Sequence, residues 1–196
     1  NLAELEEIQA GFAKMMQTAM ENMWAAKLGL DEYPPELFNE LLALMVQTPV
    51  DYTLFFRELS TVPEDLGPLK KSFYSALNST GAGGSEGLDK RWSEWLEKWQ
   101  SLLGMTARSS DSPPRSRAAI SRQMKRVNPK YSLREWFLVP AYQQADQGNY
   151  APLRELQEVI TQPYSEQSAE VEAQYYRLKP SEFFDVGGFS HYSCSS

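Results

Sequence analysis

The sequence contains few of the residues from which self-contained active sites and metal centres are built. It has one histidine, His191, and one cysteine, Cys194. A hydrolase triad needs a base held beside its nucleophile, and histidine is the usual base. A Cys194–His191 dyad is conceivable, but both residues would lie on a terminal tail, whereas such pairs come from separate rigid elements. Zinc sites need three or four His, Cys or carboxylate ligands, so we expect no metal site in this chain.

Long apolar runs and an N-terminal signal sequence are also absent. No segment approaches the roughly 18 to 20 apolar residues that span a bilayer. The opening NLAELEEIQA has neither the basic nor the apolar region of a signal peptide. A lone cysteine cannot form an internal disulfide, which fits a reducing compartment. We therefore expect an intracellular protein without a membrane partner, and we interpret the start at Asn1 instead of Met as a sign of processing or of a longer parent.

The acidic balance argues against a dedicated nucleic-acid protein. The formal net charge is -7 and the sequence pI is near 4.9, whereas phosphate contacts call for a basic surface. Hydrophobic residues make up 42% of the chain, which excludes wholesale disorder and is enough for a buried core. A chain of this length suits one large unit.

Apolar residues recur at helical spacing along most of the chain, and no segment shows the alternation typical of a strand. We predict a mainly α fold, an irregular array of helices followed by an irregular C-terminal tail. The first helix should run from Leu2 to Leu28 and end at Gly29. Other helices are predicted at 35–48 with Leu42 on the buried face, after the N-cap Asp51, and from Pro63 with an interruption near Gly67 and Pro68. Further helices are predicted at 88–103 with Gly104 as the stop, and on both sides of Gly148 and Asn149. We divide the chain into helical segments 1–104 and 105–180 and a tail, 181–196.

Two clusters of side chains each permit a functional and a structural interpretation. Trp92, Trp95 and Trp99 could stack on a ligand, but their spacing favours one buried helix face. The second cluster is a basic stretch without an acidic residue: Arg115, Arg117, Arg122, Lys125, Arg126, Lys130 and Arg134. It could bind phosphate or an acidic partner, although the solvated face of a helix is the interpretation that we favour.

Short matches to functional motifs are weak. GAGGSEG, residues 81–87, fails both common phosphate-loop patterns and follows no strand, so we interpret it as a surface loop. Asp185, Val186 and Gly187 are similar to the metal-binding D-F-G of kinases, but no H-R-D sequence precedes them. Asn78 begins a glycosylation triplet that has no meaning without secretion.

A set of ordered segments nevertheless resembles the C-terminal part of the selenoprotein O family. The segments are KLGL (27–30), LFNELLALM (37–45), DYTLFFRELS (51–60), NPKYSLREW (128–136), AYQQADQGNY (141–150), QPY (162–164) and the terminal SCSS. Each is weak alone, but they occur in the family's order and span most of the chain. REWFLVPAYQQ and the tail FFDVGGFSHY depart from the family's wording, so no role in a site is assigned to Arg134 from the resemblance.

The resemblance implies a kinase-like protein that transfers AMP from ATP to protein hydroxyl groups with a divalent metal, Mg²⁺ or Mn²⁺. The nucleotide-binding and catalytic residues of the family lie in a kinase-like region N-terminal to the matched segments, so none is expected in this chain. The functional position that transfers is Cys194, where family members carry selenocysteine or cysteine before two serines. It implies a redox-regulatory thiol. The alternative is a free-standing helical module that binds a partner without catalysis.

Overall fold

A computed structural model describes residues 2–74, 85–106 and 116–184. Within these ranges the chain is helical, with no strand beyond a single bridge between Val50 and Phe73. The elements are α1 Leu2–Leu28, α2 Pro35–Gln47, α3 Tyr52–Leu59, α4 Gly67–Lys70, α5 Ser85–Thr106, α6 Arg117–Lys125, α7 Glu135–Asp146, α8 Ala151–Thr161, α9 Ala169–Tyr175 and a 3-10 turn at Ser181–Phe183. The predicted mainly α fold is confirmed.

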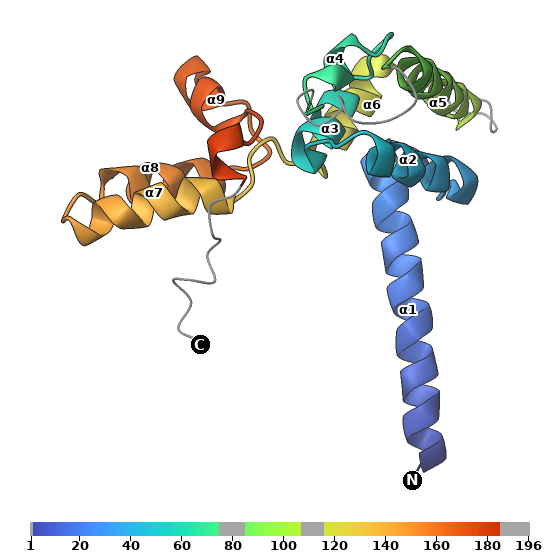
Figure 1. Cartoon of the computed structure of the whole chain (residues 1–196). Coiled ribbons are helices and arrows are strands. Elements are labelled where there is room, and N and C mark those ends of the chain that lie inside the picture. The colour runs from blue at the N-terminus through green and yellow to red at the C-terminus, as the bar shows by residue number, and fades with distance from the viewer. Residues whose placement is uncertain (1, 75–84, 107–115, 185–196) are drawn as a thin grey trace.

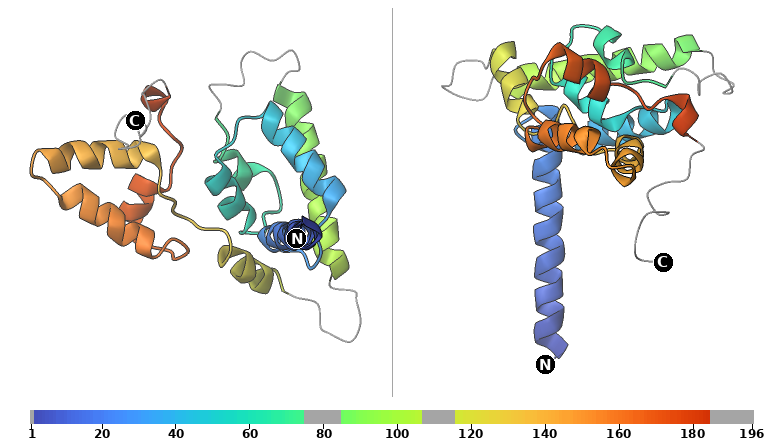
Figure 2. Two further views of the ribbon diagram at one scale, coloured as in Figure 1. Left: turned by 90° about the horizontal axis from the view of Figure 1, so that it is seen from below. Right: turned by 90° about the vertical axis from the view of Figure 1, so that its left-hand side faces the viewer.

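The helices form two groups that are joined by an extended segment (Figure 1). Helices α1 to α6 make the larger group, from which α1 projects along most of its length, and α7 to α9 make the smaller one. Figure 2 shows the two groups side by side, with residues 126–134 crossing between them. Each group has its own buried cluster, so the contact between the groups has to be explained separately.

Helix α1 ends where the sequence predicts, and the reason is backbone geometry at Gly29. Gly29 has a φ of 72°, a left-handed conformation that glycine adopts without steric cost. The Gly29 amide donates to the Ala26 carbonyl and the Leu30 amide donates to the Ala25 carbonyl, which is the Schellman arrangement. The chain therefore turns sharply and brings Leu30 into the core.

Replacing Gly29 by alanine should destabilise the fold. A left-handed alanine costs about 1–2 kcal/mol, and a Cβ at this position would lie 2.7 Å from the Met124 sulfur. Gly148 is the matched control, because its φ is 83° but a Cβ there would meet nothing within 4 Å. We expect Gly29→Ala to lower the free energy of unfolding in urea more than Gly148→Ala does. Equal losses of unfolding free energy in the two variants would show that the Met124 side chain can move away from the added Cβ without an energetic cost.

The tryptophan stripe is core, as the sequence analysis favoured. Trp92, Trp95 and Trp99 are 0–1% exposed, and their ring nitrogens donate to the Thr48 hydroxyl at 3.0 Å and to the carbonyls of Leu37 at 3.0 Å and Leu28 at 2.8 Å, respectively. Each indole N–H is thus satisfied inside the protein, as a buried donor requires. The three residues attach α5 to α1 and α2 and leave no stacking face for a ligand.

Three details of the predicted helices are wrong. Gly104 does not end α5, which continues to Thr106, because one glycine in a last turn costs less than the packing of the neighbouring Leu103 contributes. Leu42 was expected on the buried face of α2 but is 41% exposed. The helix expected from Pro63 is the four-residue α4, which begins at Gly67, where we had placed an interruption.

The described residues form two buried hydrophobic clusters, one in each helix group. The larger cluster includes Ile120 and Met124 of α6 in addition to residues of α1 to α5. The smaller cluster consists of Tyr131, Leu156, Val159 and Tyr175, with partly buried neighbours. The predicted segment boundaries at residues 104 and 180 stay a prediction.

Candidate functional site

The residues that the sequence analysis singled out for chemistry lie mostly outside the described part of the chain. The structure does not describe Cys194, His191, Asp185 or Asn78. The glycine-rich segment lies outside up to residue 84, and its last three residues begin α5. The redox role of Cys194 therefore stays a prediction.

The basic stretch, in contrast, is largely described and forms part of a buried polar network. Lys130 is 5% exposed and the Arg134 side chain is 13% exposed, so the interpretation as a solvated helix face is wrong for these two residues. Arg117, Lys125, Lys130 and Arg134 all form ion pairs with carboxylates of this chain. These charges hold the protein's own segments together.

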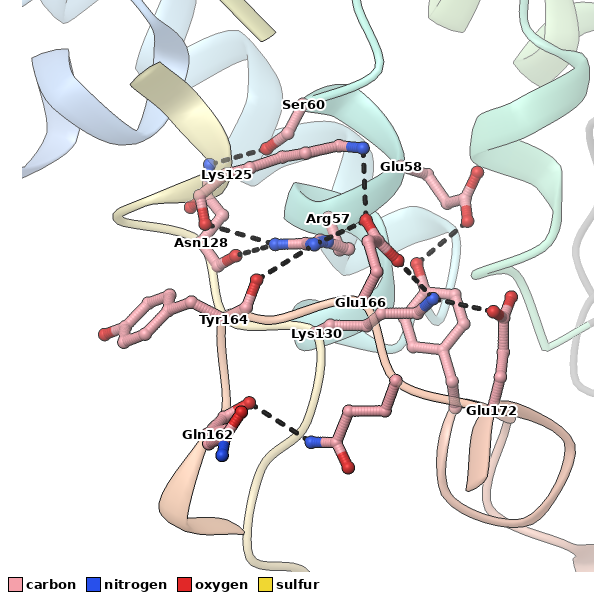
Figure 3. A network of polar contacts seen from close by, with 12 residues as sticks. Arg57, Glu58, Ser60, Lys125, Asn128, Lys130, Gln162, Tyr164, Glu166 and Glu172 are labelled. Carbon is pink, nitrogen blue, oxygen red and sulfur yellow. Dashed lines mark hydrogen bonds and ion pairs between the residues drawn. The ribbon is translucent and has the colours of Figure 1, made fainter. Parts of the chain in front are cut away.

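Arg57 of α3 is the centre of this network (Figure 3). Its side chain is 4% exposed. One terminal nitrogen donates to the carbonyls of Lys125 at 3.1 Å and Asn128 at 3.0 Å. The other donates to the Tyr164 carbonyl at 3.2 Å and to Glu166 Oε1 at 2.7 Å. We call the extended segment, residues 126–134, the linker. The planar guanidinium joins α3 to the linker and to the loop between α8 and α9, a geometry that lysine could not reproduce.

Glu166 forms ion pairs with three basic side chains that belong to separate segments. It accepts hydrogen bonds from Arg57, from Lys125 at 3.2 Å and from Lys130 at 2.6 Å. Partial burial alone would raise the pKa of Glu166, but the hydrogen bonds from Lys130, Arg57 and Lys125 outweigh it and lower the pKa to about 2. Glu166 is therefore charged under all ordinary conditions and fixes the α8–α9 loop against the first helix group.

Lys130 and Tyr176 extend the network toward α9. Lys130 also contacts Glu172 at 2.7 Å. Burial tends to lower the pKa of Lys130, but the hydrogen bonds to Glu166 and Glu172 produce a net increase. Tyr176 donates to Glu58 Oε1 at 2.8 Å, and burial together with the charge of Glu58 raises the pKa of Tyr176. Tyr176 stays protonated, as a donor to a carboxylate must.

Asn128 connects the linker to the end of α1. It is fully buried, and its side-chain nitrogen donates to the Lys27 carbonyl at 2.9 Å and to the Ser60 hydroxyl at 3.0 Å. Its side-chain oxygen accepts from Lys27 Nζ at 3.0 Å, and burial lowers the pKa of Lys27. Every hydrogen-bonding atom of the Asn128 side chain is thus used, which fixes the linker at its first residues.

A second ion pair anchors the other end of the linker. Asp51 caps α3 by accepting from the Leu54 amide at 3.0 Å, as predicted. The same carboxylate accepts hydrogen bonds from both terminal nitrogens of Arg134, one of them at 2.9 Å, and from the Tyr74 hydroxyl. This bidentate pair is the stronger form of arginine–carboxylate contact. Arg134 therefore has a structural position at the start of α7.

Four of the segments that carry the family resemblance contribute residues to these polar contacts. KLGL contributes Lys27, DYTLFFRELS contributes Asp51 and Arg57, and NPKYSLREW contributes Asn128, Lys130 and Arg134, while QPY contributes the Tyr164 carbonyl. Their convergence gives a physical reason for these residue types to occur together. They join the two helix groups across an interface where no large hydrophobic contact is present in the described residues.

The charges of the network are paired with one another, so the network holds segments of the chain together. In residues 2–74, 85–106 and 116–184, no three His, Cys, Asp or Glu residues are placed to hold a metal ion. A pocket of about 600 Å³ borders the network and is lined by Glu58, Lys71, Tyr176 and Lys179, among others. Within this pocket the Tyr176 hydroxyl donates to Glu58. We name Arg57, Asn128, Lys130, Glu166 and Glu172 the linker network.

Acid should weaken the linker network through Glu166. Its folded-state pKa, about 2, is below the ordinary value of 4.5, so its stabilising contribution is present above pH 4.5 and is lost as the pH falls toward 2. We expect the urea midpoint to fall between pH 5 and pH 3, and Glu166→Gln to have a lower midpoint at pH 7 and a smaller fall. Glu40→Gln, in an exposed pair with Lys98, is the control. A fall as steep in Glu166→Gln as in the parent would contradict this assignment.

Sequence reasoning missed Arg57 and Glu166. The available signal for Arg57 was its position in FFREL, an arginine between residues that are all buried. Burial of a charged residue requires a partner. Glu166 had no local signal, since its bond to Arg57 joins residues 109 positions apart.

Comparisons with known proteins match most of this chain. The family model described as "Protein adenylyltransferase SelO" matches residues 1–161. The chain is 36% identical over 191 residues to the "Protein nucleotidyltransferase YdiU" of Tolumonas auensis, covering 94% of this chain and 34% of that protein. It is 35% identical over 190 residues to the protein of the same name from Methylobacillus flagellatus, covering 91% and 33%. The chain thus spans about a third of the length of these relatives. Among the helices in the described ranges, none is long and apolar enough to cross a membrane.

Proposed function

Because the chain belongs to the SelO family of protein adenylyltransferases, we propose that it is the helical C-terminal region of an enzyme that transfers AMP from ATP to serine, threonine or tyrosine hydroxyls of proteins. The observation that carries the proposal is the family match over residues 1–161. The nucleotide and its Mg²⁺ or Mn²⁺ bind a kinase-like region outside this chain. The complete protein is intracellular, cytoplasmic in a bacterium or mitochondrial in a eukaryote.

In the proposed reaction a protein hydroxyl oxygen attacks the α-phosphorus of ATP. The new oxygen–phosphorus bond forms as the bond to the bridging oxygen of the β-phosphate breaks, so pyrophosphate leaves and the hydroxyl proton passes to a base. Binding and positioning dominate the catalysis of such transfers. The part of this chain is structural: the linker network keeps the two helix groups in one arrangement beside the catalytic region.

The experiment for this function uses the complete protein in which this chain is encoded. Incubation with ATP, Mg²⁺ or Mn²⁺ and a general protein substrate should add AMP to hydroxyl side chains, as read by peptide mass spectrometry. Omission of the metal is the control and should abolish the transfer. A complete protein that transfers phosphate or no group at all would overturn the proposal.

Cys194 is proposed to regulate that activity. Its thiol and a second cysteine in the catalytic region form a disulfide, and the two electrons and two protons released pass to an oxidant such as glutathione disulfide. The disulfide clamps the terminus onto the catalytic region, and reduction releases it. Peptide mapping of the complete protein under oxidising and reducing conditions tests this proposal. If Cys194 stays free under mild oxidation, or Cys194→Ser leaves the redox response of AMP transfer unchanged, the clamp is wrong.

A second candidate is a stand-alone helical module that binds another protein without catalysis. The exposed apolar residues of α1, such as Ile8 at 68% and Phe12 at 62%, are the observation that favours it. The reading frame distinguishes the two candidates. A start codon immediately before Asn1 favours the module, whereas an upstream sequence with a Gly-rich loop, a strand lysine and a metal-binding aspartate favours the transferase.

A further inference from the structure

Within the described residues, helix α1 contacts the other helices only near its C-terminal end. Ala25 and Leu28 are buried and Trp24 is partly buried against the larger cluster. The preceding turns project into the open (Figures 1 and 2), and the described side chains from residue 5 to residue 20 are all exposed. A free helical segment of this kind is only marginally stable in water, so its projecting part lacks the tertiary contacts that normally stabilise a helix.

The exposed part of α1 is amphipathic. We name its apolar face the α1 stripe: Leu5, Ile8, Phe12, Met15, Met16, Met20 and Met23, each 43–70% exposed. At the helical period these residues occupy an arc of roughly 140°. Glu6, Lys14, Gln17 and Glu21 lie on the opposite side. Exposed apolar residues confined to one face of a helix indicate a surface that another structure covers.

The period of the α1 stripe argues against a left-handed coiled coil of two copies. A strict seven-residue repeat from Leu5, Ile8, Phe12 and Met15 would continue through Ala19 and Asn22. The exposed apolar residues continue instead through Met16, Met20 and Met23, so that positions 5 and 16, and 12 and 23, are 11 residues apart. An 11-residue repeat corresponds to about 3.67 residues per turn, which does not produce the left-handed supercoil of a seven-residue repeat. Methionine-rich, straight amphipathic helices suit an apolar groove.

We propose that the α1 stripe is covered by the part of the SelO-family polypeptide that lies outside this chain. The inference rests on the proposed function. The chain spans about a third of its relatives, so about two thirds of the family polypeptide is available to cover it. Helix α1 lies inside the range that the family model matches, which makes it an element of the family. The partner surface is an apolar groove that receives about five turns of helix.

Cysteine labelling of the complete protein tests this inference. Met15→Cys on the α1 stripe is compared with Lys14→Cys on the polar face, each in the isolated chain and in the complete protein, by maleimide modification and peptide mass spectrometry. We expect position 15 to react on the order of tenfold or more slowly in the complete protein, because a covered thiol reacts only after local opening. Position 14 should react at the same rate in both.

A stability measurement accompanies the labelling. Phe12→Gln should lower the Tm of the complete protein by about 2–4 °C or more and leave the Tm of the isolated chain unchanged. Lys14→Gln should change neither. Equal labelling of position 15 in both proteins overturns the inference, as does slower labelling in the isolated chain at higher concentration, which would indicate a second copy.

The same preparations separate this inference from the proposed function. If the complete protein transfers AMP but position 15 stays fully reactive, the docking surface is wrong and the proposed function stands. If position 15 is protected but no AMP is transferred, the proposed function fails and the docking surface stands. A reading frame that encodes no further polypeptide overturns both.

Discussion

Arg57→Ala should disrupt the linker network and cost roughly 3–5 kcal/mol of stability, because it removes four hydrogen bonds of a buried guanidinium and leaves carbonyl acceptors without a donor. The substitution removes bonds to three carbonyls and to Glu166. A buried acceptor that loses its donor, as the Asn128 carbonyl would, is destabilising by about 1–3 kcal/mol. The free energy of unfolding in urea measures the loss, and Arg57 should be the most sensitive charged position in the described residues.

Two variants test the reason for that loss. Arg57→Lys keeps the positive charge but cannot donate to four acceptors at once, so it should recover only a minor part of the stability. Lys98→Ala removes one partner of an exposed pair with Glu40 and should cost at most about 1 kcal/mol. Full recovery of stability in Arg57→Lys would show that the positive charge alone matters and that the planar shape of the guanidinium does not.

Trp99→Ala should destabilise the larger helix group by about 3–5 kcal/mol, the range for a fully buried aromatic residue. Trp99 is 0% exposed, and its N–H satisfies the carbonyl at the end of α1. Trp99→Phe keeps most of the ring volume but leaves that carbonyl unpaired, so it should cost about 1–3 kcal/mol. Thermal or urea unfolding measures both variants.

The control for Trp99 is Val46→Ala. Val46 is 85% exposed, and surface substitutions of this kind stay within about 0.5 kcal/mol. If Trp99→Ala lowers the free energy of unfolding no more than Val46→Ala does, the tryptophans of α5 are not core residues, and the interpretation that they stack on a ligand is favoured instead.

Local features of the sequence were sufficient to predict the parts of the fold that local physics determines. Gly29 ends α1 because only the left-handed conformation makes its closing hydrogen bonds. Asp51 caps α3 because a short carboxylate reaches the free amide of Leu54. The tryptophan spacing predicts a buried face because helical periodicity places the rings on one side. Each of these predictions depends on residues within a few positions.

The interface between the helix groups could not be predicted in the same way. Arg57 meets Glu166 across 109 positions, and Asn128 meets Lys27 across 101. No periodicity links such residues, and a basic stretch is ordinarily solvated. The family resemblance placed the correct segments in one set without indicating that they touch. Only the three-dimensional structure shows that they share one network.

The most direct measurement of the central claim is AMP transfer by the isolated 196-residue chain. The chain is incubated with labelled ATP, Mg²⁺ or Mn²⁺ and a general protein substrate, beside the complete protein in which it is encoded. The account predicts labelled substrate with the complete protein and none above background with the isolated chain, because the residues that bind the nucleotide lie elsewhere. Robust transfer by the isolated chain would contradict it.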